Sequence, residues 1–197
     1  MGSYKKYFFA LLFTVAIMIS GCVSTGAAMD ELAGIGKLTV EDDKFNQATR
    51  VRLTPSWIAI EQPAGLKQVA DFMLGAIWST DDPDIAFIHA EIPNFSEINY
   101  EGIRGVAFSF GGEQVTYNTS RLTSFDGGES ANFIPIPMEL LEYITSSPND
   151  VRVRLLLLGN EYMEGLFSAD VSVRGNTTMR KHLKSKWLPM VAEARKQ

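Results

Sequence analysis

His89 and Glu91 are residues whose types and spacing could support chemistry. They lie two positions apart in the apolar stretch 85–92, which reads as a β-strand, so both side chains share one face with Phe87. An imidazole beside a carboxylate could form a proton relay or half of a metal site. No second histidine is nearby, and the single cysteine is far away in the sequence. We therefore interpret His89 as a structural histidine at a sheet edge.

Asp81, Asp82 and Asp84 could offer carboxylate oxygens to a hard cation. The sequence after them lacks the glycine and the glutamate of calcium-binding loops. An Asp- and Pro-rich segment between two apolar stretches is typical of a turn. We expect solvated loops here and at 41–43 and 126–129. The chain also has no glycine-rich phosphate loop, cysteine pair, haem motif or paired-carboxylate signature, so we expect no cofactor and no metal.

Ser109 is the one serine in a catalytic-type context, the segment Ala107-Phe108-Ser109-Phe110-Gly111. This spacing resembles the Ala-x-Ser-x-Gly variant of the hydrolase nucleophile elbow, which needs a strand, a sharp turn and then a helix. Here Ser109 falls inside a strand pattern, and 112–117 reads as a returning strand. Only His89 and His182 could act as its base. We therefore interpret Ser109 as a structural residue.

The N-terminus has the features of an export signal. Lys5 and Lys6 precede an apolar stretch, residues 7–19, that is short for a bilayer span of about 20 residues. It ends in Ile19-Ser20-Gly21-Cys22, which resembles the lipobox of bacterial lipoproteins. The resemblance implies that the chain is cut before Cys22 and that Cys22 carries the lipid. Because Cys22 is the only cysteine, lipidation also accounts for an exported chain with one thiol.

This resemblance divides the chain into a signal peptide (1–21), a lipidated tether (22–33) and one domain (34–197). Several acyl chains on one residue are sufficient for stable anchoring, so the membrane is the expected partner of the N-terminus. Val23 stands where lipoproteins kept in the inner membrane carry Asp. By this resemblance the protein faces the periplasm from the outer membrane.

The charges are unevenly distributed. The whole chain carries a net charge of −5, but the segment from Arg174 onward holds seven basic residues and Glu193 alone as an acid. The body before it is therefore strongly acidic, which excludes nucleic acid as an expected partner. A basic segment on an acidic body indicates either an intramolecular match or a surface-seeking tail.

Residues 104–117 predict a tight hairpin. Two apolar, alternating stretches flank Gly111-Gly112, a dipeptide suited to a two-residue turn. That loop predicts three cross-strand pairs: Phe110 with Glu113, Phe108 with Val115, and Val106 with Tyr117.

Other strands are expected at 72–78, 85–92 and 151–158. We also expect a hairpin over 48–61 around Pro55-Ser56, with Leu53 opposite Ile58. Arg-Val-Arg-Leu occurs at 50–53 and again at 152–155. We interpret the two copies as amphipathic strands with arginines facing water, rather than as an internal duplication.

Two helices are expected. The first, 137–144, has Pro at its start and a Ser-Ser-Pro end. The second begins near residue 176, and Pro189 should kink or break it at Leu188. Its apolar positions recur at helical spacing: Met179, Leu183, Trp187, Met190 and Ala194. The fold class is therefore α+β, predominantly antiparallel β in a sheet or a sandwich, with one short inserted helix and a C-terminal helix.

The C-terminal helix also carries a candidate membrane or partner face, formed by Arg180, Lys181, Lys184, Lys186 and Trp187. Basic residues beside an apolar stripe are typical of an interfacial helix. The simpler interpretation is that the stripe packs on the sheet, with Trp187 mostly buried, and that the lysines face water.

Two functions follow from these patterns. The leading hypothesis is a membrane-anchored envelope lipoprotein with a non-catalytic binding or accessory role, for example for an envelope protein. The alternative is an envelope hydrolase with a site assembled around His89 from distant strands.

Overall fold

The protein is described by a computed structural model over residues 30, 32–44, 46–62, 65–93 and 102–196. Ten of the described strands form one sheet, in the order β6-β5-β9-β10-β2-β3-β4-β8-β7, with β1 paired to β2 off this path; β11 and β12 form a small second sheet. The bounds are β1 Leu38–Asp43, β2 Ala48–Glu61, β3 Lys67–Ser79, β4 Ile85–Ile92, β5 Ile103–Phe110, β6 Glu113–Asn118, β7 Ser124–Asp126, β8 Glu129–Pro137, β9 Val151–Leu157, β10 Tyr162–Phe167, β11 Ser172–Val173 and β12 Asn176–Thr177.

Alternation of apolar and polar residues gives most strands one buried face. In β9, for example, Val151, Val153 and Leu155 are buried while Arg152 is exposed. The ladders between named strands are antiparallel. The expected fold class is thus correct in outline: the described chain is mostly antiparallel sheet, with a C-terminal helix and a minor inserted helix.

The hairpin predicted over 48–61 is wrong, because these residues form the single strand β2. Pro55 lies in an irregular stretch between Leu53 and Ser56, where the register with β3 shifts. A proline lacks an N–H for the ladder, and a bulge accommodates it. Gly75 on β3 allows this bulge, since a Cβ there would lie 2.5 Å from the Leu53 carbonyl oxygen and 2.9 Å from the Pro55 nitrogen.

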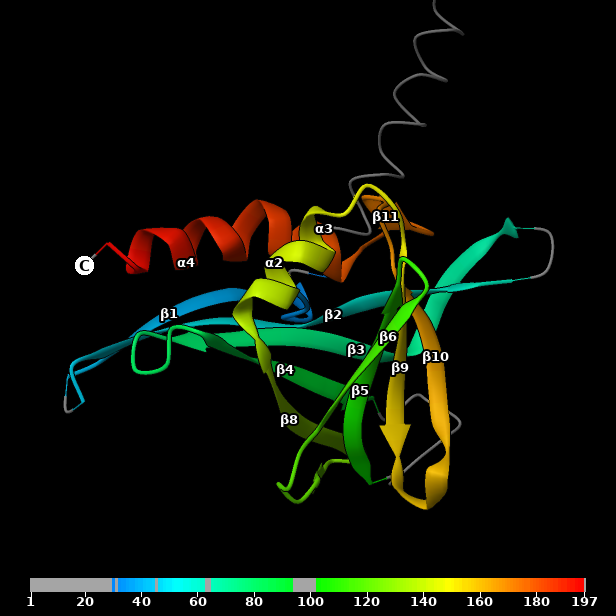
Figure 1. Cartoon of the computed structure of the whole chain (residues 1–197), viewed down its shortest axis with the longest axis horizontal. Coiled ribbons are helices and arrows are strands. Elements are labelled where there is room, and N and C mark those ends of the chain that lie inside the picture. Colours follow the sequence, from blue (N-terminus) through cyan, green and yellow to red (C-terminus); the bar gives the residue numbers. More distant parts are fainter. Residues whose placement is uncertain (1–29, 31, 45, 63–64, 94–101, 197) are drawn as a thin grey trace, which may run out of the picture.

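The irregular β2 has different neighbours at its two ends: β1 pairs with 48–53, and β10 pairs near Ala59. In Figure 1 the strands β5, β6, β9 and β10 run steeply across the direction of β1, β2, β3 and β4. The two ends of the sheet lie close together. Asn132 of β8 donates from Nδ2 to the carbonyl oxygen of Ile103 in β5 at 2.8 Å. The sheet therefore curls around the main hydrophobic core.

The hairpin around Gly111-Gly112 is confirmed. β5 and β6 pair Phe110 with Glu113, Phe108 with Val115 and Val106 with Tyr117. Both loop glycines have positive φ, 58° and 85°, as a type I′ turn requires. The loop at 126–129 is likewise a tight turn, between β7 and β8. Residues 41–43, expected in a loop, belong instead to β1, where Glu41 pairs with Arg50.

The inserted helix α2 spans Met138–Ser146, one residue later than Pro137 suggested. The C-terminal helical segment comprises α3 (Met179–His182), the π-helical η3 (Leu183–Trp187) and α4 (Leu188–Ala194). Pro189 does not break it; the irregularity is the π turn, in which the Leu188 N–H bonds the Leu183 carbonyl. No helix among the described residues is long and apolar enough to cross a membrane.

The apolar stripe of this segment packs into the core, as predicted. Met179, Leu183 and Trp187 are fully buried, and Val191 rather than the half-buried Met190 continues the buried stripe. Figure 1 shows the segment lying along the β1 and β2 side of the molecule. Burial of a side chain as large as Trp contributes on the order of 2–3 kcal/mol, so this stripe fixes the helix on the sheet.

Asp30, the first residue that the structure describes, lies within the range assigned to the tether and makes folded contacts. Asp30 is buried and accepts hydrogen bonds from Trp57 Nε1 at 2.9 Å and from the Thr177 N–H at 3.1 Å. Both donors belong to the body of the domain. Asp30 is thus held against β2 and β12.

Candidate binding site

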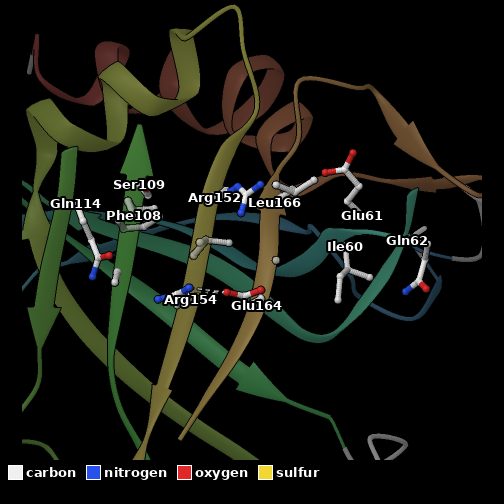
Figure 2. A pocket seen from close by; sticks show the side chains of 13 residues that line it. Ile60, Glu61, Gln62, Phe108, Ser109, Gln114, Arg152, Arg154, Glu164 and Leu166 are labelled. Atoms are coloured by element: carbon white, nitrogen blue, oxygen red, sulfur yellow. Dashed lines mark hydrogen bonds and ion pairs between the residues drawn. The ribbon is translucent and has the colours of Figure 1, made fainter. Parts of the chain in front are cut away.

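A groove of about 520 Å³ crosses the outer face of β5, β9 and β10 and reaches the end of β2. In Figure 2, Gln114 lies at one side of this groove and Glu61 and Gln62 at the other, with Arg154 and Glu164 between them. Its polar side chains are Glu61, Gln62, Ser109, Gln114, Arg152, Arg154 and Glu164. We refer to this surface as the outer groove.

Strand register explains how these side chains come together. Arg152 pairs with Ser109 on one side and with Leu166 on the other, and Arg154 pairs with Ala107 and Glu164. Because paired residues point to the same face, both arginines project outward beside small neighbours. Because Ala107 and Ser109 have small side chains, they leave space beside the two arginines, and this space is part of the groove.

The charges in the outer groove are mixed. Arg154 and Glu164 form an ion pair, with Nη2 to Oε1 at 2.7 Å, and the Arg154 guanidinium lies 4.5 Å over the Tyr162 ring. Arg152 is exposed and has no ion pair with any residue that the structure describes. The groove thus offers a free guanidinium, amides, a hydroxyl and the carboxylate of Glu61. This mixture suits a polar ligand that both donates and accepts hydrogen bonds.

Ser109 lies in this groove but lacks what a nucleophile needs. It sits inside β5 and is followed by the Gly-Gly hairpin instead of a helix. Neither His89 nor His182 lines the groove. Among the described residues, Ser109 thus has no histidine beside it in the groove to act as the base that an activated nucleophile needs.

His89 is buried on β4, where its ring stacks on that of Phe133 with centroids 4.5 Å apart. Burial, together with the positive charge of Arg52, lowers its pKa to about 4, so the imidazole is neutral. Its Nδ1 has no hydrogen-bond partner in the described part of the chain. On the same strand, burial and the charge of Glu129 raise the pKa of Glu91 to about 7, which Arg52 partly opposes. The contacts of a hydrolytic site around His89 are thus missing among the described residues.

His182 is hydrogen-bonded to a serine, with Nδ1 2.8 Å from Ser56 Oγ. Ser56 is fully buried and also donates to the Thr177 carbonyl oxygen at 3.2 Å. The nearby carboxylate of Asp30 accepts from Trp57 and Thr177, and no hydrogen bond links it to the imidazole. A substrate cannot reach a hydroxyl with no exposed surface, so this cluster is structural: it fastens β2 and Asp30 to the C-terminal segment.

The candidate basic face is only partly on the surface. Lys181, Lys184 and Lys186 are exposed, whereas Arg180 and Trp187 are buried. Arg180 donates to the carbonyl oxygens of Thr145, Asn149 and Phe167, at 3.1, 2.8 and 3.4 Å. It therefore closes the loop after α2 against the helix. The remaining face consists of three lysines.

The other candidate residues are dispersed. Cys22 and residues 1–21 lie outside the described residues. Asp81, Asp82 and Asp84 are exposed in the turn between β3 and β4, as expected. Over the residues that can be described, no three His, Cys, Asp or Glu side chains gather as a metal site requires.

Sequence reasoning missed Arg152, Arg154, Gln114, Glu61 and the other groove residues as a site. One signal was available: the second Arg-Val-Arg-Leu, 152–155, indicated outward arginines. It did not indicate which strands would lie beside them, because β5 and β10 are brought there by the sheet.

Comparison with protein-family models, with curated proteins and with solved structures found no match.

Proposed function

We propose that this protein is a lipid-anchored lipoprotein of the bacterial envelope, with a non-catalytic binding role exerted through the outer groove. The protein faces the periplasm. Because Val23, and not Asp, follows Cys22, we place the anchor in the outer membrane. The lipobox-like end of the N-terminal segment supports the anchor.

The observation that carries the binding role is the composition of the outer groove. It presents Arg152, Gln114 and Ser109 as unpaired hydrogen-bonding groups within the described chain, next to the paired Arg154 and Glu164. No histidine lines it. Such a surface can hold a polar envelope component or a segment of an envelope protein without transforming it.

Site-specific photocrosslinking in intact cells tests this role. A photoreactive residue at Gln114 should give a discrete adduct, and the same residue at Asp71, which is exposed on β3 outside the groove, should not. Arg152→Gln should reduce the Gln114 adduct at least several-fold. Equal adducts at Gln114 and Asp71, or none at either, would contradict the proposal.

A further inference from the structure

A second hollow lies on the other half of the sheet, with a volume of about 510 Å³. It is separate from the outer groove and shares no lining residue with it. Three arginines surround it: Arg50 and Arg52 from β2, and Arg121 from the segment before β7. Its apolar surface comes from Ile77, Phe87 and Phe133. We call these six residues the arginine pocket.

Arg52 is the most informative member of the arginine pocket. It is half-buried, its Nε atom is buried, and this Nε has no hydrogen-bond partner among the described residues. A buried guanidinium nitrogen without an acceptor costs free energy, because it has lost water and gained nothing in return. Two titratable groups lie within electrostatic range of Arg52: the neutral imidazole of His89, and Glu91, which forms no hydrogen bond or ion pair with Arg52 in the described chain.

The other two arginines are also incompletely paired. The Arg121 guanidinium lies 5.1 Å from the centroid of the Phe87 ring, and no ion pair to it occurs in the described chain. Arg50 reaches the Asp43 carboxylate only at 3.8 Å, longer than a charge-assisted hydrogen bond of about 2.8 Å. Three guanidinium groups thus line one hollow, and none of them has an ion pair shorter than 3.8 Å in the described chain.

Three acidic residues on the pocket lining limit what can enter. Glu41, Asp81 and Asp82 are exposed, and none forms an ion pair with the three arginines in the described chain. They would repel an extended polyanion such as a nucleic acid. A compact ligand with one anionic group can reach Arg52 and Arg121 without contacting all three acids.

The aromatic side chains define the rest of the ligand. The Arg121 guanidinium lies over the Phe87 ring, and the Phe133 ring stacks on that of His89. Flat apolar surfaces of this kind accept a ring or an apolar body by stacking. A guanidinium fork binds phosphate or carboxylate oxygens in a bidentate manner.

We propose that the arginine pocket is a binding site for a small molecule that carries one oxyanion, phosphate or carboxylate, on a ring or other flat apolar body. The oxyanion contacts Arg52 and Arg121, and the ring lies on Phe87 and Phe133.

Calorimetric titration of the full-length protein in detergent tests this site, with phenyl phosphate and benzoate as probes. Inorganic phosphate and benzyl alcohol each carry half of the proposed ligand and should bind at least tenfold more weakly than the better probe. Arg52→Gln should weaken that probe at least tenfold. Arg104→Gln, which removes an exposed arginine of β5 outside the pocket, should change its Kd less than twofold.

Thermal unfolding separates a binding role from a structural one. Arg52→Gln removes a cation whose Nε has no hydrogen-bond partner, but it also removes the attraction between Arg52 and the Glu91 carboxylate. At pH 5, where Glu91 with its pKa of about 7 is protonated, the Tm of the unliganded variant should therefore equal or exceed that of the wild type. A clear fall in Tm would mean that Arg52 stabilises the fold and would overturn the proposal. So would binding of neither probe at millimolar concentration, or loss of binding in Arg152→Gln instead of Arg52→Gln.

Discussion

Trp187 Nε1 donates a hydrogen bond of 3.0 Å to the carbonyl oxygen of Val51, across 136 residues of sequence. Both residues are fully buried. The contact joins the π-helical segment η3 to the first half of β2, and it satisfies the one polar atom of an otherwise apolar side chain. The indole thus fixes both the position and the rotation of the C-terminal segment.

Replacing Trp187 should therefore be costly. Trp187→Ala should lower the free energy of unfolding by about 3–5 kcal/mol, since it leaves a large cavity in the core. Lys184→Gln is the matched control on the exposed side of the same segment and should change it by less than about 0.5 kcal/mol. Urea denaturation measures both. Equal effects of the two variants would contradict the view that the apolar stripe dominates docking.

Gly75 should be intolerant of any side chain. Gly75→Ala would place a Cβ against backbone atoms of the β2 bulge, at 2.5 Å from the Leu53 carbonyl oxygen, and backbone cannot move aside cheaply. We expect a loss of about 1–3 kcal/mol or more, measured as a lower urea midpoint. Gly111→Asn is the control: its Cβ meets open space, and Asn-Gly favours the same turn, so stability should hold or rise. If Gly75→Ala were neutral, the bulge would have another cause.

Glu91 should make the domain less stable as pH rises. Its folded pKa of about 7 lies above the ordinary value of 4.5, so the folded state binds the proton more tightly and loses stability between pH 4.5 and 7. His89 and His182 act in the opposite direction. Burial lowers both pKa values from 6.5 to about 4, so stability falls as pH drops from 6.5 to 4.

Glu91→Gln should remove only the first of these effects. The stability of this variant relative to the wild type should therefore increase from pH 5 to pH 8, as measured by urea denaturation at each pH. Glu113→Gln, at an exposed position in β6, should follow the wild-type profile. A constant difference between Glu91→Gln and the wild type across this range would show that Glu91 is not protonated in the fold.

Cys22 should carry the lipid. Cys22→Ala removes the thiol at the end of the lipobox-like segment, so the protein should accumulate as an uncut precursor without acyl chains. Labelling with a palmitate analogue and the size of the chain on a gel report both effects. Label that persisted in Cys22→Ala would place the modification elsewhere.

Local sequence was enough to predict elements whose structure depends on neighbouring residues. The Gly111-Gly112 hairpin is one, because only a two-residue turn with positive φ matches the alternation of the flanking strands. The strand at 85–92 and the buried stripe that includes Leu183 and Trp187 are others, since hydrophobic periodicity determines which face is buried.

The tertiary structure decided what depends on distant segments. Pro55-Ser56 has the composition of a turn, yet β2 continues through it because Gly75, on another strand, makes room for a bulge. Arg180 and Lys184 are both cations of the C-terminal helical segment. Arg180 is buried, where it donates to carbonyl oxygens of α2 and the following loop, whereas Lys184 is exposed. Charge type alone cannot distinguish them.

The two hollows show the same division. Both Arg-Val-Arg-Leu segments bury Val and Leu and turn their arginines outward, as alternation predicts. The segment 152–155 lines the outer groove beside β5 and β10, whereas 50–53 lines the arginine pocket with Phe87 and Phe133. This difference depends on how the sheet curls. Strand pairing between remote residues sets these neighbours, and the local pattern contains no information about them.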